Sequence, residues 1–567
     1  MIYDYVIVGG GLSGLYSCYR LLKFNPRIRI LLLESKQKLG GRCETIKFKD
    51  KDNKIIQYEA GGARFSYKHV RVIKLLKQLK LLDTKIKIPN TIEFITYPKH
   101  LYSMYKEEFT TFDSIITRIR NIIKKENITN KELRNTTLFN IIKKYCNNYY
   151  PIEIYKHHFH SFVYDYFSYW SETNTLNAID ALHIFSKEFN NTIQYYILKN
   201  GYSSIISKLL EKCTKFKGFE YKTLSYVEQI KCNHNTKLDT DITNNHICYT
   251  ITYNNYNNLN SNNSNNSNII NCNNIILAIP ILSLKKIKFK GYKQFVKNTS
   301  RLNNLITKHL KTEPLFRIYA RYPNFYFNIN EDGTKTKINN VWFHDIKKVS
   351  SNVNIKFIIP VNLKTGLIMI SYTDGDIAKK IQSKLLTNYK SYDSFTNLST
   401  IYDKMNQIIK DDLSKIFPNK SIPEPIWIKQ HYWTEGATYW KPSLMSNNTI
   451  TPQEYSKYLG NIMCNLLNDD IPRTVNNIKR GKIFLVGENI SIHQAWIEGC
   501  LQSVDECFTK FITNYNINKS LINKSYYIHT GSKTKKNLKA KQKGSSRNKF
   551  INTKKQAHTL KIKKKYT

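Results

Sequence analysis

Apolar runs alternate with a glycine-rich turn and an amphipathic segment at the start of the chain. Residues 5–8, Tyr-Val-Ile-Val, form a continuous apolar run and predict a buried strand. Residues 15–22 predict a helix, and the apolar run 28–33 predicts a second strand. The order strand, turn, helix and strand is that of a βαβ unit.

Three glycines lie in the turn between the first strand and the helix. Gly9, Gly11 and Gly14 have G-x-G-x-x-G spacing, and Ser13 lies in the same turn. Such glycines allow a tight turn, close approach of the backbone to a pyrophosphate and close packing of the helix on the strand. Glu34 follows the second strand, where a carboxylate commonly binds ribose hydroxyls. The spacing therefore predicts a bound dinucleotide, with its phosphates at the helix N-terminus.

Two further motifs each place an arginine shortly after a pair of glycines. They are Gly40-Gly41-Arg42 and Gly61-Gly62-Ala63-Arg64. Such a backbone suits close contact with a large planar cofactor that carries a diphosphate, so Gly41, Arg42, Gly62, Ala63 and Arg64 are candidate cofactor-binding residues. A generic NAD-binding unit with incidental glycines is the alternative interpretation.

The remaining pattern predicts further helices and strands. Helices are expected at 69–82, 112–125 and 138–149, after 200–202 with serines placed to cap the helix, and from 494 onward. Strands are expected at 221–230, 246–253, 274–280, 315–321, 356–360, 366–372 and 482–489. The Asn/Ser-rich run 254–274 predicts a surface loop, and Asp374-Gly375 predicts a turn.

The motifs within residues 6–64 together resemble the flavin-containing amine oxidase superfamily of monoamine, polyamine and L-amino-acid oxidases. The C-terminal motifs, Gly487-Glu488 after an apolar run and a helix start near Trp496, agree with it. The resemblance implies an α/β fold, in which a Rossmann-like FAD-binding domain is interleaved with an α+β substrate-binding domain. It assigns FAD-binding segments to 1–84, 200–289 and 441–515, and substrate-domain segments to 85–199 and 290–440.

The same resemblance implies which residues hold FAD. Gly487 and Glu488 correspond to a pair that binds the ribityl and phosphate region, and Val227 corresponds to a residue whose backbone binds adenine. Ile497 belongs to the helix whose N-terminus lies under the flavin. Monoamine oxidases tether FAD through a cysteine, but residues 433–440 contain none, so non-covalent binding is expected.

The resemblance also implies the reaction. A hydride moves from the carbon next to the amine nitrogen to flavin N5, water hydrolyses the imine, and O2 reoxidises the flavin to give H2O2. Aromatic side chains face the flavin in this family. Trp496 corresponds to one wall, and Thr438, Tyr439 or Trp440 supplies the other, with Tyr439 preferred. Ordinary core packing is the alternative for either aromatic residue.

Arg64 is relevant to the choice of substrate, and Arg317 to the reoxidation of the flavin. L-amino-acid oxidases hold the substrate carboxylate with an arginine that corresponds to Arg64, although Arg64 could instead bind FAD phosphate or a neighbouring carboxylate. The substrate is therefore expected to be an amine, with an L-amino acid as one option. Arg317 stands where many relatives place a lysine that reaches flavin N5 through water. Arginine keeps its proton near neutral pH, so Arg317 is a catalytic candidate that brings reoxidation by O2 into question.

Two other functions fit the motifs less directly. One is a desaturase or porphyrinogen-oxidase-like flavoenzyme, which would need a wide, wholly apolar cavity without the Trp496 wall. The other is a non-catalytic flavoprotein scaffold that binds a polyanion through its basic C-terminal residues.

Composition adds a basic tail and an intracellular setting. The net charge is +46, and residues 531–567 contain fourteen Lys or Arg and no Asp or Glu. Residues 516–567 therefore predict a disordered tail, which either contacts a polyanion such as nucleic acid or is simply solvated. The ten cysteines are scattered, and no metal-ligand spacing, signal peptide or transmembrane run occurs, so a reduced intracellular compartment is expected. The bias toward Asn, Ile and Tyr suggests an AT-rich source such as a giant virus or a protist.

Overall fold

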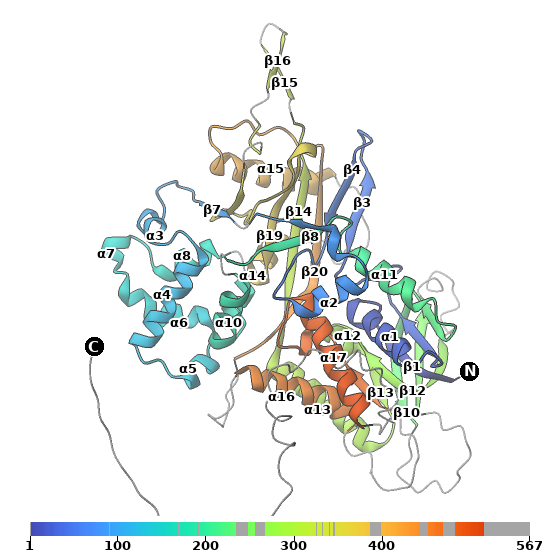
Figure 1. Cartoon of the computed structure of the whole chain (residues 1–567). Helices are drawn as coiled ribbons and strands as arrows, with labels where there is room; N and C mark the ends of the chain where they lie inside the picture. Colours follow the sequence, from blue (N-terminus) through green and yellow to red (C-terminus); the bar gives the residue numbers. More distant parts are fainter. Residues whose placement is uncertain are drawn as a thin grey trace, which may run out of the picture. The chain divides into compact units, whose positions relative to one another are not determined.

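An eight-stranded sheet collects strands from three distant parts of the chain (Figure 1). Its order is β13-β10-β11-β12-β1-β2-β9, and β21 also pairs with β12. The strands are β1 Ile2–Val8, β2 Ile30–Leu33, β9 Phe219–Lys222, β10 Ser225–Cys232, β11 Tyr249–Asn255, β12 Asn268–Leu277, β13 Lys288–Lys290 and β21 Ile483–Leu485. β1 pairs in parallel with both β2 and β12, which confirms the predicted βαβ unit around α1 (Leu12–Phe24).

The computed structural model describes most of the chain. The described residues are 2–89, 91–167, 170–189, 192–233, 248–255, 267–324, 326–330, 333–338, 341–343, 346–385, 399–442, 452–468 and 482–514. The predicted tail, 516–567, lies outside them, as does most of the Asn/Ser-rich run. Met1–Thr509 forms one compact unit, so the residue limits of the two interleaved domains stay a prediction.

The composition of the Asn/Ser-rich run 254–274 predicted a surface loop, but part of the run forms a strand. Residues 268–274 belong to β12, whose ladder pairs Asn271 with Ile2 and with Thr250. The side chain of Asn274 also bonds to the backbone of two neighbouring segments. Its Nδ2 donates to the Asp4 carbonyl over 3.0 Å, and its Oδ1 accepts from the Lys482 N–H over 3.1 Å. These cross-strand bonds overcome the weak strand propensity of asparagine.

A second, four-stranded antiparallel sheet stands beside the first. Its order is β18-β19-β14-β20, with β18 Ile359–Asn362, β19 Leu367–Asp374, β14 Leu310–Arg321 and β20 Trp427–Trp440. Phe316, Ile368 and Ile370 are fully buried in its core, beneath α14 (Gly375–Leu385) and α15 (Ser399–Ile416). This sheet confirms the predicted strands at 315–321 and 366–372.

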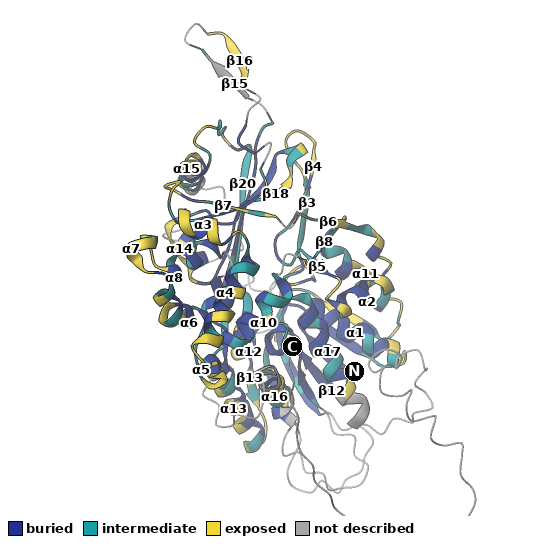
Figure 2. Ribbon diagram, turned by 60° about the vertical axis from the view of Figure 1, so that its left-hand side comes forward, coloured by how far each residue is buried: buried dark blue, intermediate teal, exposed yellow. Residues whose placement is uncertain are grey.

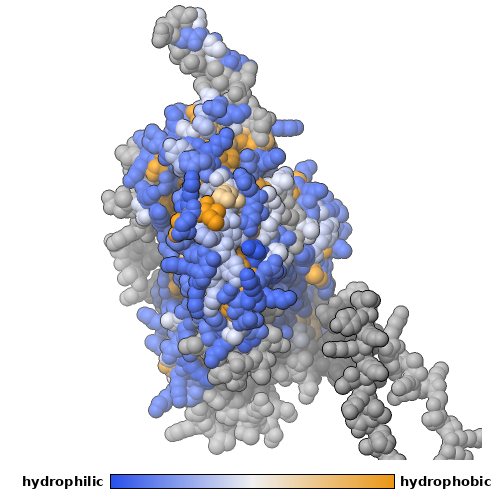
Figure 3. Space-filling model, turned by 90° about the vertical axis from the view of Figure 1, so that its left-hand side faces the viewer, coloured by the Kyte–Doolittle hydropathy of each residue, from blue (hydrophilic) through white to orange (hydrophobic). Residues whose placement is uncertain are grey.

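Residues 103–188, between β7 and β8 in the sequence, form a helical segment rich in aromatic residues. It contains α3 Ser103–Glu108, α4 Phe112–Lys125, α5 Asn130–Asn135, α6 Leu138–Tyr145, α7 Ile152–Tyr155, α8 Phe159–Tyr166, α9 Trp170–Asn174 and α10 Ala178–Glu188. Tyr105 stacks on Phe162 in its core with 4.9 Å between ring centres. In Figure 2 the helices of this segment are buried on the sides that face one another and exposed on the sides that face away from the rest of the chain. The face shown in Figure 3 is mostly hydrophilic, with few apolar side chains. Met104 and Ile154 of this segment are exposed large hydrophobic residues.

The helical segment is attached to the second sheet by buried polar contacts. Lys356 Nζ lies 3.0 Å from Asp165 Oδ1, and Ser350 Oγ donates to the Tyr166 carbonyl over 2.9 Å. Both contacts join α8 to the region of β17 (Lys348–Ser351). Breaking the ion pair would leave an uncompensated buried charge, so these contacts fix where the helical segment meets the sheet.

Smaller elements complete the fold. The short strands are β3 Thr45–Lys49, β4 Ile55–Glu59, β5 Phe65–Ser66, β6 Lys85–Lys87, β7 Ile92–Ile95, β8 Tyr195–Leu198, β15 Tyr326–Ile329 and β16 Lys335–Ile338. The other α-helices are α2 Val70–Gln78, α11 Ser203–Cys213, α12 Ile281–Lys286, α13 Lys293–His309, α16 Pro452–Asn465 and α17 Ile497–Asn514. Among the described helices, none is long and apolar enough to cross a membrane.

Several predicted boundaries were wrong. The helix predicted at 69–82 is confined to α2, and that at 138–149 changes into a 3-10 turn at Cys146–Tyr149. No serine caps α11, because Ser203 Oγ instead accepts from the Thr45 N–H over 2.8 Å. The strand predicted at 356–360 begins only at Ile359, since Phe357 has a left-handed φ of 62°. Asp374-Gly375 is not a turn between strands, because β19 ends at Asp374 and α14 begins at Gly375.

Candidate active site

The first glycine turn has the shape that a bound dinucleotide requires. Gly9 has φ of 104°, and an added Cβ would lie 2.4 Å from the Ala278 carbonyl oxygen. A Cβ on Gly14 would lie 1.9 Å from the Gly9 carbonyl oxygen, so α1 packs directly against β1. A Cβ on Gly11, in contrast, would have no neighbour nearer than 4.0 Å. The turn is therefore closed at Gly9 and Gly14 and open at Gly11, where a phosphate could approach.

Glu34 is held beside this turn at the end of β2. Its Oε2 accepts from the Gly10 N–H over 2.7 Å, and its Oε1 accepts from the Lys36 N–H over 2.8 Å. The Glu34 carbonyl accepts from Ser225 at the start of β10, two residues before the buried Val227. The structure thus brings the two residues predicted for the ribose and adenine ends of the cofactor to one edge of the sheet.

The second glycine motif meets the C-terminal motif. Arg42 Nη1 donates to Glu488 Oε1 over 2.8 Å, and Glu488 Oε2 accepts from the Ala495 N–H over 3.0 Å. Gly41, with φ of 56°, would place a Cβ 3.4 Å from the Gly11 Cα. Gly487 precedes Glu488 with φ of 143°. Three segments far apart in sequence therefore form one continuous cradle of backbone and paired charge.

A cavity of about 520 Å³ lies near this cradle, between the four-stranded sheet and the segments that contain β4, β8 and Trp496. It is large enough for a small-molecule site. Gly62, Ala63 and Arg64 line it together with Trp496 and Ile497. Strands β14, β19 and β20 supply the opposite wall, and the helix α9 closes one side. All three predicted catalytic residues, Trp496, Tyr439 and Arg317, line this cavity.

Trp496 lies in an aromatic group that carries a positive charge. Its ring stacks on Tyr195 at 5.8 Å with 16° between the planes, and the His69 ring lies 4.8 Å away. The Arg64 guanidinium carbon lies 4.8 Å from the centre of the Tyr195 ring and 5.5 Å from that of the Trp496 ring. Glu188 accepts from Tyr195 and lies 3.0 Å from His69 Nε2, which fixes the group from behind.

The predicted helix start at Gln494 was wrong, and the difference decides where Trp496 points. Ala495 has φ of 65°, a left-handed conformation that a helix does not contain, and α17 begins only at Ile497. Trp496 therefore lies in the turn before the helix. This turn directs the indole to the cavity and leaves Ala495 exposed beside it.

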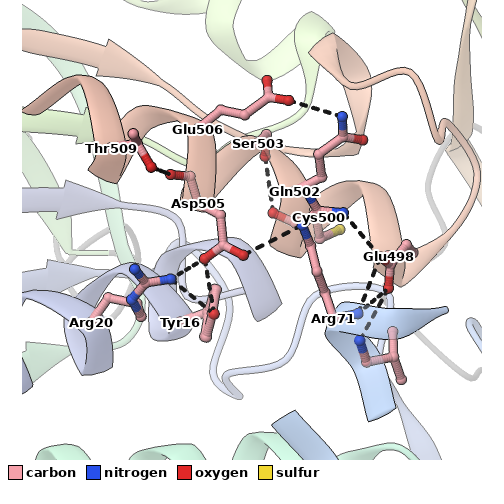
Figure 4. Close-up of polar contacts among 11 residues, drawn as sticks. Tyr16, Arg20, Arg71, Glu498, Cys500, Gln502, Ser503, Asp505, Glu506 and Thr509 are labelled. Carbon is pink, nitrogen blue, oxygen red and sulfur yellow. Dashed lines mark hydrogen bonds and ion pairs between the residues drawn. The ribbon is translucent and has the colours of Figure 1, made fainter. Parts of the chain in front are cut away.

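Ion pairs of Glu498 and Asp505 with Arg71 and Arg20 hold α17, and with it the Trp496 turn, against the first domain segment (Figure 4). Glu498 accepts from the backbone N–H groups of Arg71 and Val72, over 3.1 Å and 3.0 Å, and also pairs with the Arg71 guanidinium. A carboxylate at the start of α2 satisfies N–H groups that have no partner within the helix. About two turns further along α17, Asp505 accepts from Tyr16 and pairs with Arg20 of α1.

Arg317 and Tyr439 lie on the wall opposite Trp496. Arg317 Nη1 donates to the Glu59 carbonyl over 2.9 Å, and its guanidinium carbon lies 4.8 Å from the centre of the Tyr372 ring. Tyr439 is buried and donates from its hydroxyl to Glu172 Oε1 over 3.2 Å. Both residues are therefore held by polar contacts in addition to core packing.

Several charged cavity residues were missed by the sequence analysis, among them Glu59, Glu172, Asp374 and Lys348. Burial raises the pKa of Glu59 to about 7, and burial, followed by the charge of Arg64, lowers the pKa of Lys348 to about 7. Burial also raises the pKa values of Glu172 and Asp374, and the charge of Glu172 raises that of Asp374 further. The sequence offers little signal for them, since Glu59, Glu172 and Asp374 each follow an aromatic residue within two positions and Lys348 does not.

The cavity is therefore charged, with aromatic walls, and it lies near a dinucleotide cradle. Comparison with known families agrees with this geometry, because residues 12–504 match the profile of the flavin containing amine oxidoreductases. The chain belongs to this family. It is thus an oxidoreductase of the flavin amine oxidase type, and the family implies a flavin cofactor and an amine substrate.

Individual proteins are also similar to this chain. An uncharacterised protein, R188, of Acanthamoeba polyphaga mimivirus is 24% identical over 547 residues, covering 90% of this chain and 93% of its own length. Amine oxidase [flavin-containing] A of Bos taurus is 34% identical, but only over 88 residues, 15% of each chain. A structure of wild-type putrescine oxidase bound to putrescine has the same fold, with a TM-score of 0.55 and 13% identity, covering 90% of this chain and 99% of that one.

Proposed function

We propose that the protein is an FAD-dependent oxidase that acts on an amine, with an L-amino acid as a candidate substrate. The observation that carries this proposal is the position of Arg64 and Trp496 on one wall of a cavity near the glycine cradle. When bound, FAD accepts a hydride from the carbon next to the amine nitrogen and passes the electrons to O2, giving an imine and H2O2.

The residues of the cradle fit FAD. The open side of Gly11 would admit the pyrophosphate, Glu34 would bind ribose, and the backbone of Val227 would bind adenine. The paired Arg42 and Glu488 lie where the ribityl and phosphate region would pass. The other residues proposed to contact FAD are Gly9, Ser13, Gly14, Gly41, Gly62, Ala63, Arg64, Gly487 and Ile497.

Binding of FAD is proposed to be non-covalent. Ala437 lines the cavity in the stretch where a tethering cysteine would be needed, and residues 433–440 contain no cysteine. The affinity must then come from the cradle itself. Backbone N–H groups at the start of α1 and the buried Arg42–Glu488 pair would supply it.

The cavity walls would orient the substrate. The faces of Trp496 and Tyr439 would hold the amine, and the guanidinium of Arg64 would bind a carboxylate in a bidentate manner. Lys348, beside Arg64, adds positive charge only when it is protonated. An amine without a carboxylate would leave Arg64 without this contact, so the arrangement favours an amino acid over a simple monoamine.

Arg317 would provide a fixed positive charge in the cavity rather than a proton-exchanging group. Its guanidinium is held by the Glu59 carbonyl and by the Tyr372 ring, and arginine stays protonated. We therefore propose that Arg317 stabilises the negative charge that the flavin would gain when the amine is oxidised. Protons would then be exchanged by water and not by this side chain.

The two alternative functions have less support. A desaturase or porphyrinogen-oxidase-like enzyme would need an apolar cavity, but Arg64, Arg317 and Glu172 line this one. Polyanion binding by residues 531–567 stays a prediction that lies outside the described residues.

The cofactor claim is tested by isolating the protein and denaturing it. We expect a yellow protein that releases all of its flavin as FAD into the supernatant, and one H2O2 formed per amine consumed under air. Flavin retained by the precipitated chain would contradict non-covalent binding. Substrate oxidation without H2O2 would contradict O2 as the acceptor.

A further inference from the structure

A positively charged surface lies on α13 and on the two elements that precede it in the sequence, α12 and β13 (Figure 1). No Asp or Glu occurs between Asp241 and Glu313, whereas residues 285–311 contain nine Lys or Arg. The whole chain, in contrast, has 88 Lys or Arg and 42 Asp or Glu. This stretch therefore lacks the acids that would offset its positive charge.

Four of these cations form a stripe along one face of α13, which we call the cationic stripe. Its members, Lys293, Lys297, Arg301 and Lys308, are exposed. They recur at intervals of four, four and seven residues, which places them on the same face of a helix. The rise of about 1.5 Å per residue makes the stripe about 22 Å long. The opposite face packs on the protein, and its buried residues are Phe295, Asn298, Thr299, Leu302, Ile306 and His309.

The cations of the stripe have no acidic partner among the described contacts. The same holds for Lys288 and Lys290 on β13, which lies against α13 and exposes both side chains. Lys311, in contrast, pairs with Glu313. Six exposed cations without acids between them create a local positive potential, which attracts a polyanion and is screened by salt.

We propose that this surface binds the phosphate backbone of double-stranded nucleic acid. Lysine and arginine bind phosphate oxygens through charge-assisted hydrogen bonds. Contacts with phosphates carry no sequence information, so the binding is expected to be independent of base sequence. The inference does not depend on the proposed function, because no residue of α12, β13 or α13 lines the cavity.

Two other anionic partners fit this surface less well. Single strands are held largely by bases that stack on exposed aromatic rings. The three aromatic residues of α12, β13, α13 and their connections instead pack on one another, with the Phe295 ring centre 6.1 Å from that of Phe289 and 6.0 Å from that of Tyr292. A membrane surface requires apolar anchors. On these elements only Leu282 and Val296 are exposed large apolar residues.

The salt dependence of binding tests the proposal, because each phosphate contact adds about 0.9 to the slope of log affinity against log salt concentration. Affinity is measured by fluorescence anisotropy of a short labelled DNA duplex titrated with the full-length holoprotein. The fourfold variant Lys293→Gln, Lys297→Gln, Arg301→Gln, Lys308→Gln should lower the magnitude of the slope by about 3 to 4. It should also bind at least about tenfold more weakly near about 100 mM salt, equally for duplexes of unrelated sequence.

A matched variant removes the same charge from another part of the chain. Lys47→Gln, Lys49→Gln, Lys51→Gln, Lys54→Gln changes exposed cations of the β3–β4 hairpin, which lies at the opposite end of Figures 1 and 2 from α13. Both variants keep residues 531–567 and have the same net charge, so a difference between them reports the position of the charge. The hairpin variant should keep the wild-type slope within about one unit.

Each outcome supports or overturns the proposal. Absence of duplex binding by the wild type, or equal slopes for the two variants, would overturn it, and wild-type slopes in both would assign binding to another part of the chain. Binding to vesicles of phosphatidylserine and phosphatidylcholine without binding to duplex would also overturn it. If the fourfold variant does not fold, Lys297→Gln alone should lower the slope by about one. Failure of every amine to reduce the flavin would remove the proposed function and leave the duplex result unaffected.

Discussion

The guanidinium carbon of Arg64 lies 5.5 Å from the centre of the Trp496 ring, although Arg64 follows the Gly61-Gly62 pair near the N-terminus and Trp496 belongs to the C-terminal motif. Tyr195 completes the group from a third segment, with its ring parallel to the indole. A fixed positive charge above an aromatic wall is suited to a substrate that carries both a carboxylate and an amine. The contact therefore connects the cofactor motifs to substrate choice.

The Arg64→Met variant should show whether Arg64 contributes to the binding of amino acids more than to the binding of simple amines. If Arg64 binds a carboxylate, the variant should lose about 30- to 100-fold in kcat/KM for an L-amino acid, the loss expected for a bidentate charged contact, and less for the amine of the same side chain. Steady-state kinetics with such a substrate pair measure this. Arg301→Met, at an exposed position on α13, is the control. Equal losses for both substrates would assign Arg64 to packing or to the cofactor.

Gly11→Ala and Gly14→Ala should have different effects, although both glycines belong to one motif. A Cβ on Gly14 would meet the Gly9 carbonyl oxygen at 1.9 Å, so this variant should fail to fold or lose most of its stability. A Cβ on Gly11 meets nothing nearer than 4.0 Å, so the apoprotein should melt within about 2 °C of wild type while FAD binds at least about tenfold more weakly. Melting curves and FAD titration of the apoproteins test both. Normal FAD affinity in Gly11→Ala would show that the phosphates lie elsewhere.

The Glu498 contacts in Figure 4 should contribute strongly to stability. Glu498→Gln removes the only carboxylate that the described contacts place at the N–H groups of Arg71 and Val72, and leaves the Arg71 guanidinium only Asp505, which should cost about 2–4 kcal/mol in the free energy of unfolding. Chemical denaturation of the holoprotein measures this. Glu506 on the same helix accepts only from Gln502 among the described contacts. The control variant Glu506→Gln should therefore lower the free energy of unfolding by less than about 1 kcal/mol. Similar costs for both variants would contradict the proposed anchoring of the Trp496 turn.

Lys348 should make stability depend on pH. Burial lowers the pKa of Lys348 to about 7, whereas an unfolded lysine titrates near 10.4, so between these values the unfolded chain binds more protons. Stability should therefore rise with pH across this window, by up to about 1.4 kcal/mol per pH unit from this residue. Thermal melts from neutral pH to about pH 10 should show a steeper rise for wild type than for Lys348→Met. Parallel curves would place the Lys348 ammonium in water.

Much of the cradle could be predicted from sequence because its constraints are local. Gly9, Gly14 and Glu34 follow from spacing within a single βαβ unit, and the structure confirms that unit. The direction of Trp496 could not be predicted, since it depends on the left-handed backbone of Ala495. An alanine gives no signal for that conformation.

The proximity of Glu172 and Asp374 could not be predicted from the sequence, for a different reason. Glu172 and Asp374 are brought together only when α9 packs on the end of β19, with Asp374 accepting from the first N–H groups of α9. In the sequence, Asp374-Gly375 has the composition of a turn, and Glu172 is a single acid in an aromatic stretch. Contacts between residues this far apart leave no periodicity to detect.

The central claim is that this flavoprotein oxidises an amine, and anaerobic reduction of its bound flavin tests it most directly. The purified holoprotein is mixed, without O2, with a panel of monoamines, diamines and L-amino acids while the visible flavin absorbance is followed. The account predicts that at least one substrate bleaches the flavin, and that admitting O2 restores the absorbance with formation of H2O2. An intact flavin spectrum with every member of the panel, from a protein that dithionite reduces normally, would contradict it.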